Sequence, residues 1–367
     1  MIVLYCILGA YSLILFWLCF GFLKTKTFYT HSQHSSRKIS IIITARDEEK
    51  YLARCINSIA AQDYPRDLMD IVFIDDASSD HTLSIAKSLL MQSGIHHQII
   101  KNTSRHGKKL SIRKAVQLAK ADFIITRDAD TFTISNFWLE NLMDFWSQTQ
   151  SDFMIGPIAL SNYNGLLWAL QAIENNILAV IAAGSSYYKI PFLCSGANLA
   201  FTKKVFNQTN GYQSHLHIES GDDILFLEEV KKIPGVKINY LKTEQALVYT
   251  YPCFNFKSLI EQKVRWAGKF KMNSNIFNSF LAVVTFLVNI LWLFCFIYWF
   301  ISPSNNVAPF IFVLLKLGID FLILLGSFKL IKNKSLLWYS LPVSLIYPIY
   351  TCIVAIASLF LKPKWKS

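Results

Sequence analysis

The run Ile39-Ser40-Ile41-Ile42-Ile43-Thr44 decides how the rest of the sequence is interpreted. It is rich in β-branched residues and almost continuously apolar, which is typical of a strand buried on both faces of a sheet. Two similar runs follow at residues 70–75 and 122–126, and helical spacing occupies residues 49–61 and 82–92. This alternation of strands and helices predicts a parallel α/β sheet with crossover helices.

The apolar residues outside this region collect at the two ends of the chain. Residues 2–23 form an unbroken apolar run of membrane-spanning length. Lys24, Lys26, Arg37 and Lys38 follow this run, whereas no basic residue precedes it. The positive-inside rule therefore predicts an integral membrane protein whose following domain faces the cytosol, and we expect it in the inner membrane of the cell.

Three more apolar runs close the chain, at residues 280–301, 307–328 and 336–361. Lys316 and Asp320 lie one helical turn apart in the second run, so we expect them to pair with each other. The third run contains two prolines and has lysines on both sides, which leaves its topology open. We expect an N-terminal transmembrane helix over residues 1–23, a cytosolic domain over 24–275 and a C-terminal transmembrane region over 276–367.

One further apolar stretch, residues 166–183, is interrupted by Gln171, Glu174, Asn175 and Asn176. On composition it is too polar to span a membrane and too apolar to be solvated. Two interpretations stay open for it: a helix in the core of the domain, or a helix lying at the membrane interface.

The charge and the cysteines exclude two classes of protein. The formal net charge is +12, but no zinc-finger spacing and no lysine- or arginine-rich tract is present, so we expect no nucleic-acid partner. Basic residues beside apolar segments instead favour anionic lipid headgroups. The 7 cysteines form no CxxC pair, which argues against a disulfide framework or a zinc site.

Acidic residues follow the predicted strands. Asp75 and Asp76 end the second strand, where a carboxylate can bind the base or ribose of a nucleotide. Asp128 and Asp130 come directly after the third strand, and two carboxylates in this arrangement can converge on one Mg²⁺ or Mn²⁺ ion that also binds substrate phosphates. The alternative for the first pair is a helix cap and for the second a turn, but their positions after buried strands favour a function.

Two further sets of residues carry possible chemistry. Asp222 and Asp223 are adjacent carboxylates, and such a pair can separate its pKa values so that one acts as a general base. Gln262, Arg265 and Trp266 share one helical face. An arginine suits phosphate and a tryptophan suits a sugar or base, although both are also common anchors at a membrane interface.

In this order and spacing, residues 40–268 resemble the membrane-bound family-2 glycosyltransferases. The branch in question contains cellulose, chitin, hyaluronan and poly-N-acetylglucosamine synthases and ceramide glucosyltransferase. The resemblance implies a GT-A-type (Rossmann-like) α/β domain that uses a nucleotide sugar. Thr44 and Asp47 depart from the usual proline and asparagine, and Ser195 departs from the usual cysteine before Gly196.

The resemblance also implies roles for individual residues. Binding of the donor, most often a UDP-sugar, is implied for Thr44, Glu48, Asp76, Lys108, Asp128, Gln262, Arg265 and Trp266. The metal, Mg²⁺ or Mn²⁺, is implied at Asp128 and Asp130. Contact with the acceptor is implied for Cys194, Ser195, Gly196, Asp222 and Trp266. Asp223 matches the catalytic base of an inverting transfer, while His106, His215 and His217 are expected to be surface or supporting residues.

The functions that remain possible differ in the molecule that accepts the sugar. We expect a single transfer to a lipid or lipid-linked acceptor, because four apolar spans make a thin wall for a secretion channel. The alternative is a processive polysaccharide synthase, which would need an oligomer or an accessory subunit. Outside the class, a nucleotidyltransferase would need a glycine-rich loop after the first strand, where residues 45–49 contain no glycine. A non-catalytic membrane protein is the remaining alternative.

Overall fold

The computed structural model describes residues 2–30, 37–213, 221–271, 276–301 and 307–361. They divide into two compact units. The sheet unit comprises residues 25–161 and 186–251, and the helical unit comprises residues 1–24, 162–185 and 252–367. The domain limits expected from the sequence stay a prediction.

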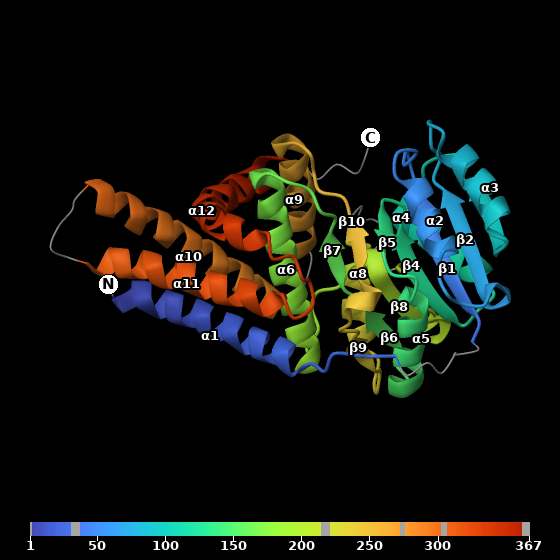
Figure 1. Cartoon of the computed structure of the whole chain (residues 1–367), viewed down its shortest axis with the longest axis horizontal. Helices are drawn as coiled ribbons and strands as arrows, with labels where there is room; N and C mark the ends of the chain where they lie inside the picture. Colours follow the sequence, from blue (N-terminus) through green and yellow to red (C-terminus); the bar gives the residue numbers. More distant parts are fainter. Residues whose placement is uncertain (1, 31–36, 214–220, 272–275, 302–306, 362–367) are drawn as a thin grey trace. The chain divides into compact units, whose positions relative to one another are not determined.

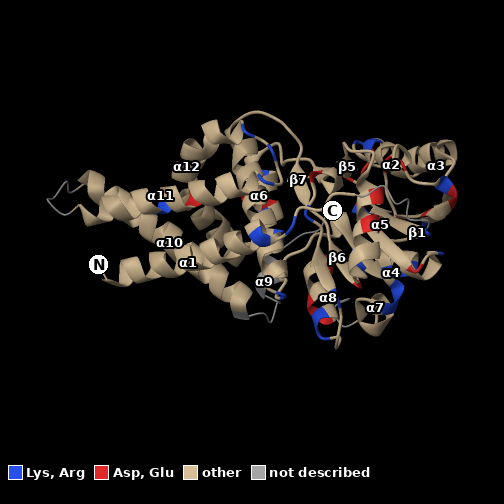
Figure 2. Ribbon diagram, turned by 60° about the horizontal axis from the view of Figure 1, so that its bottom comes forward, with Lys and Arg blue, Asp and Glu red and all other residues tan. Residues whose placement is uncertain are grey.

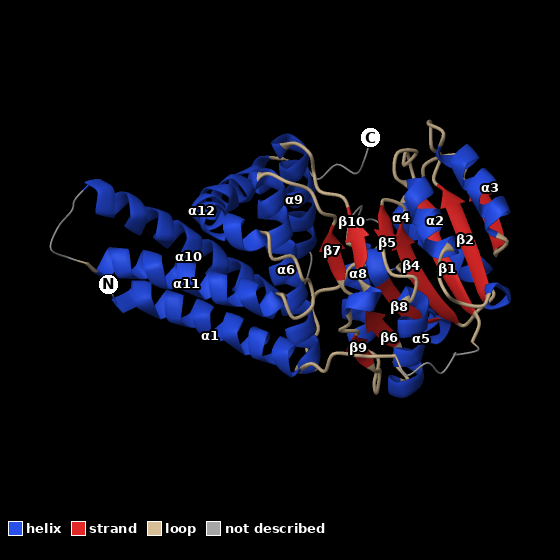
Figure 3. Cartoon of the chain, in the orientation of Figure 1, coloured by secondary structure: helices blue, strands red, loops and turns tan. Residues whose placement is uncertain are grey.

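The sheet unit is built on a seven-stranded sheet in the order β3-β2-β1-β4-β8-β6-β9 (Figure 3). The strands are β1 (Ile39–Ala45), β2 (Met69–Asp75), β3 (His96–Lys101), β4 (Phe123–Asp128), β6 (Phe153–Ile155), β8 (Leu199–Thr202) and β9 (Ile238–Tyr240). β1 lies parallel to both β2 and β4, as the sequence predicts. β8, which lies outside the region where the sequence shows this pattern, runs antiparallel to β4 and to β6, so the whole sheet is mixed.

Helices cover both faces of this sheet, which explains the continuous apolar runs in its central strands. They are α2 (Leu52–Ala60), α3 (Thr82–Ser93), α4 (Lys108–Leu118), α5 (Trp138–Thr149), α7 (Lys203–Gln208) and α8 (Asp222–Lys231). Residues of α2, α3 and α5 join Ile39, Ile41 and Ile43 in one buried cluster. The even-numbered Ile42 and Val72 point to the opposite face and are also buried.

A second, three-stranded sheet completes this unit. Its order is β5-β10-β7, with β5 at Thr131–Thr133, β7 at Ile158–Leu160 and β10 at Val248–Thr250. β5 follows β4 after only two residues, so the second sheet begins where the metal-binding candidates Asp128 and Asp130 lie. Phe132 of β5 stacks on Tyr249 of β10 and stabilises the pairing of these two strands.

The helical unit contains α1 (Ile2–Lys24), α6 (Leu166–Tyr187), α9 (Phe256–Lys271), α10 (Ile276–Ile301), α11 (Ala308–Ser327) and α12 (Leu336–Phe360) (Figure 1). Among the described residues, five helices are long and apolar enough to cross a membrane: α1, α6, α10, α11 and α12. Few charged side chains interrupt α1, α10 and α12 (Figure 2).

The expected pairing of Lys316 with Asp320 on α11 is confirmed. Lys316 Nζ lies 2.7 Å from Asp320 Oδ2, and the lysine is completely buried. Tyr11 of α1 donates a hydrogen bond of 2.7 Å to Asp320 Oδ1. The two charges therefore neutralise each other between helices and hold α11 against α1.

Helix α6 is long and apolar enough to cross a membrane. The prediction from the sequence, that this stretch is too polar to span a membrane, is therefore wrong. The strands before and after α6 in the chain nevertheless exclude that α6 alone crosses the membrane between them. The chain before α6 forms β4 and the chain after α6 forms β8, and these two strands pair in one sheet. If α6 crossed a membrane, the two strands would lie on opposite sides of it.

The contacts of α6 also show that it crosses the other helices. Along its length Trp168 meets Tyr339 of α12, Asn176 meets Ser327 at the end of α11, and Gly184 meets Leu18 of α1. Successive partners from three helices mean that α6 runs across them and not alongside one of them, and its steep inclination to α1, α10 and α11 is visible in Figure 1. This direction favours the interfacial interpretation.

Candidate active site

The carboxyl end of β1 is the geometric centre of the candidate site. Thr44 is aligned with Ile74 of β2 on one side and with Asp128 of β4 on the other. The next residue, Ala45, is aligned with Asp75. The parallel register therefore brings the acidic ends of β2 and β4 to one edge of the sheet, next to Thr44.

Asp76 organises the loop that leads to α4. Its Oδ1 accepts hydrogen bonds from Asn102 Nδ2 and from the backbone N–H of His106, both at 2.9 Å, and its Oδ2 accepts from Gly107 N at 2.8 Å. Burial raises the pKa of Asp76, but these three hydrogen bonds outweigh it and hold the pKa below its ordinary value. Asp76 is thus an ionised anchor for the loop that precedes Lys108.

Lys108, the first residue of α4, joins two acidic segments. Its Nζ lies 2.7 Å from Asp128 Oδ1 and 3.2 Å from Asp222 Oδ2. Burial lowers the pKa of Lys108, but the two carboxylates outweigh it and raise the pKa well above its ordinary value. Asp128 and Asp222, which come from separate parts of the chain, therefore both contact the ammonium group of Lys108.

The first turn of α8 brings Asp223 beside the segment at Gly196. Asp223 Oδ1 accepts from Ile224 N at 2.8 Å, and its Oδ2 accepts a longer bond of 3.4 Å from Gly196 N. A methyl group on Gly196 would lie 3.3 Å from both Asp222 Oδ2 and Lys108 Nζ. Glycine at this position therefore keeps the space between the lysine and the two aspartates open.

The neighbouring acceptor candidates lie on the same segment. Cys194 Sγ is 3.3 Å from the Asp223 carbonyl oxygen, and Ser195 Oγ accepts from Ala197 N to begin a short 3₁₀ turn at Gly196–Asn198. Both side chains are thus engaged with the protein around Asp223. The structure brings Lys108, Asp128, Asp222, Asp223 and residues 194–196 together.

The metal candidates fit a site that is completed by substrate. Asp130 follows Asp128 in the turn between β4 and β5, so the two carboxylates come from one short segment. Among the described residues no group of three or more histidine, cysteine, aspartate or glutamate side chains could hold a metal ion. Two aspartates are nevertheless enough, because Mg²⁺ is commonly bound by one or two carboxylates together with substrate phosphates.

The remaining candidates are placed elsewhere. Glu48 lies in the loop after β1, where its backbone N–H donates to Thr82 Oγ1 at 2.7 Å. Gln262, Arg265 and Trp266 lie on α9, which belongs to the helical unit. His106 is exposed, as expected, and His215 and His217 lie outside the described residues.

Arg127 is a buried charge that the sequence interpretation did not single out. It is 1% exposed and its guanidinium carbon lies 4.5 Å from the centre of the Trp138 ring. Its three guanidinium nitrogens have no hydrogen-bond partner among the described residues. A charged residue at the end of an otherwise apolar strand, directly before Asp128, was the signal in the sequence.

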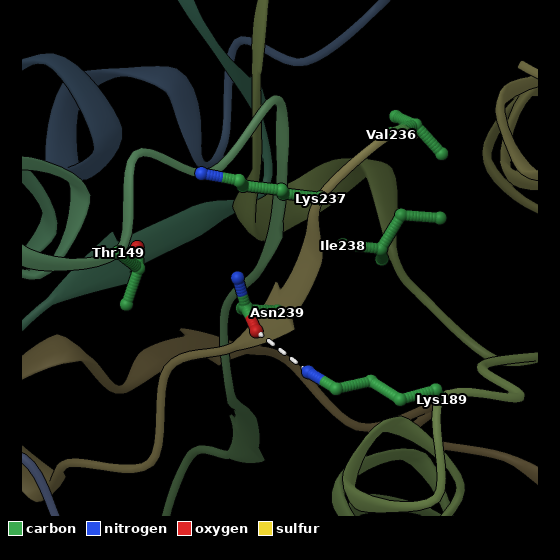
Figure 4. A pocket seen from close by; sticks show the side chains of 6 residues that line it. All are labelled: Thr149, Lys189, Val236, Lys237, Ile238 and Asn239. Carbon is green, nitrogen blue, oxygen red and sulfur yellow. Dashed lines mark hydrogen bonds between the residues drawn. The ribbon is translucent and has the colours of Figure 1, made fainter. Parts of the chain in front are cut away.

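A pocket of about 460 Å³ lies away from this site (Figure 4). It is lined by Thr149, Lys189 and residues 236–239, and Lys189 Nζ donates to Asn239 Oδ1 at 3.4 Å. β9 has the same direction as β4, because β6 is parallel to β9 and both β6 and β4 are antiparallel to β8. The pocket therefore lies at the amino ends of these strands, whereas Asp128 lies at their carboxyl ends.

Comparisons with known proteins bear on this arrangement. Residues 40–209 match the family model described as glycosyl transferase family 2. A relative in Methanococcus voltae is 25% identical over 331 residues, covering 86% of this chain and 94% of its own length. It is a dolichyl N-acetyl-α-D-glucosaminyl phosphate 3-β-D-2,3-diacetamido-2,3-dideoxy-β-D-glucuronosyltransferase.

Two further matches define how far the likeness extends. Poly(ribitol-phosphate) β-N-acetylglucosaminyltransferase TarS of Staphylococcus aureus (strain Mu50) is 29% identical over 129 residues, which is 35% of this chain and 22% of that protein. A mannosyltransferase of Pyrobaculum calidifontis, solved with GDP-mannose and Mn²⁺, superimposes with a TM-score of 0.63 over 98% of this chain and 97% of its own at 15% identity. This likeness confirms the expected GT-A-type fold.

Proposed function

We propose that this chain, whose residues 40–209 match the model of glycosyl transferase family 2, transfers a sugar from a nucleotide-sugar donor to a lipid-linked acceptor. The observation that carries the proposal is the contact of Lys108 with both Asp128 and Asp222. It brings the loop expected to hold the donor phosphates, the expected metal ligands and the helix of the expected base to one point.

The chemistry assigned to the site is an inverting displacement. Asp223 accepts the proton of an acceptor hydroxyl, whose oxygen forms a bond to the anomeric carbon of the donor sugar. The bond from that carbon to the diphosphate oxygen breaks, and the nucleoside diphosphate leaves with the electron pair. The backbone N–H groups of Gly196 and Ile224 donate to the Asp223 carboxylate and orient it for this role.

The negative charge that develops on the diphosphate needs cationic partners. Lys108 supplies one from the start of α4, and Arg265 of α9 is assigned a second contact. A divalent cation, when bound by Asp128 and Asp130, neutralises the diphosphate and makes it a better leaving group. A protein of the same fold holds GDP-mannose and Mn²⁺, which supports this assignment.

Two observations support a lipid-linked acceptor. The described residues contain apolar helices of membrane-spanning length, and the Methanococcus relative, which spans most of this chain, is named for a dolichyl phosphate-linked acceptor. We assign the membrane surface on the cytosolic side as the place of transfer, with the N-terminus of α1 on the outer side. The narrower branch of the family expected from the sequence stays a prediction.

A donor screen on the purified full-length protein tests the proposal. UDP- and GDP-sugars are incubated with Mg²⁺ or Mn²⁺ and with extracted membrane lipids, and released nucleoside diphosphate and labelled lipid are measured. We expect one donor to be consumed, and excess EDTA to abolish transfer. In a parallel incubation with nucleoside triphosphates and sugar 1-phosphates, formation of a nucleotide sugar with release of pyrophosphate would instead indicate a nucleotidyltransferase. A ladder of long products from the nucleotide-sugar donors would indicate a polymer synthase.

The variant Asp223→Asn tests the catalytic assignment. Loss of a general base typically costs about 10²- to 10⁴-fold in rate, so we expect kcat to fall by about this factor while the circular dichroism spectrum is unchanged. Turnover like that of the wild type would refute the role of Asp223. The exposed Lys87→Met on α3 is the control and should transfer sugar normally.

A further inference from the structure

A buried ion pair joins α6 to α9. Lys263 Nζ lies 2.6 Å from Glu174 Oε2, and the side chains of Lys263 and Glu174 are 8% and 17% exposed. Both residues belong to the helical unit. Glu174 was one of the polar residues that interrupt the apolar run of α6, and this contact accounts for its presence there.

The same lysine also contacts the motif tryptophan. Lys263 Nζ lies 3.9 Å from the centre of the Trp266 ring, within the range of a cation–π contact. Lys263 and Trp266 are three residues apart on α9, so they lie on neighbouring parts of one helical surface. The ammonium group occupies one side of the ring, and Trp266 as a whole is only half-buried.

A second contact from α6 fixes the chain just before α9. Gln171 Nε2 donates to the Cys253 carbonyl oxygen at 3.0 Å, and Gln171 Oε1 accepts from Cys253 N at 2.8 Å. Gln171 and Glu174 are three residues apart and lie on one side of α6. Helix α6 therefore holds α9 at its entrance and again near its middle.

We propose that Glu174 and Lys263 are positioning residues that hold the Trp266 ring in the orientation needed by a sugar acceptor. Glu174 fixes the Lys263 ammonium, and the ammonium fixes one face of the indole. In this proposal the opposite face stacks on the apolar face of a sugar ring. The kinetic part of this inference rests on the proposed sugar transfer, whereas the structural part does not.

The structural part is tested by ¹⁹F NMR on full-length protein labelled with 5-fluorotryptophan, in which Trp266→Phe identifies the Trp266 signal. We expect Lys263→Met and Glu174→Gln to shift or broaden this signal, and Lys263→Arg to restore it near its wild-type position. Lys257→Met on the same helix is the matched control, because Lys257 is exposed. A Trp266 signal unchanged in both Lys263→Met and Glu174→Gln would overturn the proposal.

The kinetic part separates positioning from general damage. Removing the cation–π contact should raise the acceptor KM about five- to tenfold, while the donor KM and the melting temperature change little. The double variant should be no worse than either single one, because the residues act as one unit. Equal changes in donor and acceptor KM would overturn the proposal, and a wild type inert towards all donors would refute the proposed function but leave the NMR result decisive.

Discussion

Lys108 lies between two carboxylates whose charges would repel each other without it. Asp128 Oδ1 and Asp222 Oδ2 are both within 3.2 Å of its ammonium group, and Asp222 is buried. In Lys108→Met these oxygens lose their partner. We expect the free energy of unfolding to fall by about 1–3 kcal/mol and the donor KM to rise, as measured by denaturant titration and initial rates. Unchanged stability and donor KM would mean that the contact has no energetic value.

Asp76 gives a pH dependence whose sign follows from its lowered pKa. A carboxylate with a folded-state pKa below its ordinary 3.8 adds stability that is fully present above that value and is lost as the pH falls through the folded-state pKa. We therefore expect Asp76→Asn to be less stable than the wild type at neutral pH and the difference to shrink only below pH 3.8. Acid titration of both proteins by circular dichroism measures this. A difference that disappears near neutral pH would contradict the assigned hydrogen bonds.

Some residues of the candidate site could be predicted from the sequence, but the contacts between them could not. Asp128 was predictable because it follows a buried strand together with Asp130, and Asp223 because it is one of two adjacent carboxylates. The hydrogen bonds that the backbone N–H groups of His106 and Gly107 donate to Asp76 could not be predicted, because they join residues about thirty positions apart and the loop between them has no sequence pattern. The same applies to Lys108, which was matched to the donor phosphates and not to Asp222.

At the scale of the element, the clearest constraint is the contact between α6 and α1. A methyl group on Gly184 would lie 2.0 Å from the carbonyl oxygen of Leu18, so the two backbones touch and no side chain fits. We expect Gly184→Ala to lower the unfolding free energy in detergent by about 1–3 kcal/mol. Gly318→Ala on α11, where nothing lies within 4 Å, is the matched control and should be neutral or slightly stabilising. Equal effects of the two substitutions would contradict the close approach.

Some elements were predictable from periodicity and others were not. β1, β2 and β4 lie in the middle of the sheet, so burial on both faces gives them continuous apolar runs. β3 begins with His96, His97 and Gln98 and lies at the edge of the sheet, where its residues are mostly half-exposed and leave no apolar run. β8 is only four residues long, and its antiparallel direction depends on contacts with β4 and β6 that no local pattern records.

At the scale of the whole molecule, the sheet limits how the chain can cross a membrane. Residues on both sides of α6 contribute to one sheet, so both must lie in the same compartment. Within the part of the chain that the structure describes, α1, α10, α11 and α12 remain as candidates for crossing. The proposed orientation, with the N-terminus outside, would place the sheet unit and the connection between α11 and α12 in the cytosol, and Val307 before α11 on the outer side. Lys329, Lys332 and Lys334 follow α11 and favour this orientation by the positive-inside rule, whereas Lys362, Lys364 and Lys366 follow α12 and leave the topology of that last helix open.

Cysteine labelling distinguishes this arrangement from one in which α6 crosses. Asn164→Cys and Lys189→Cys flank α6, Val307→Cys precedes α11 and Lys334→Cys precedes α12, and all four positions are exposed. In inside-out membrane vesicles we expect a membrane-impermeant maleimide to label positions 164, 189 and 334 but not 307, above the labelling of the native cysteines. Among the native cysteines, Cys55 should not react with the maleimide, because burial raises the pKa of its thiol to about 11. Labelling of 164 and 189 from opposite sides would contradict a sheet built from both halves of the chain, because the strands before and after α6 could then no longer pair.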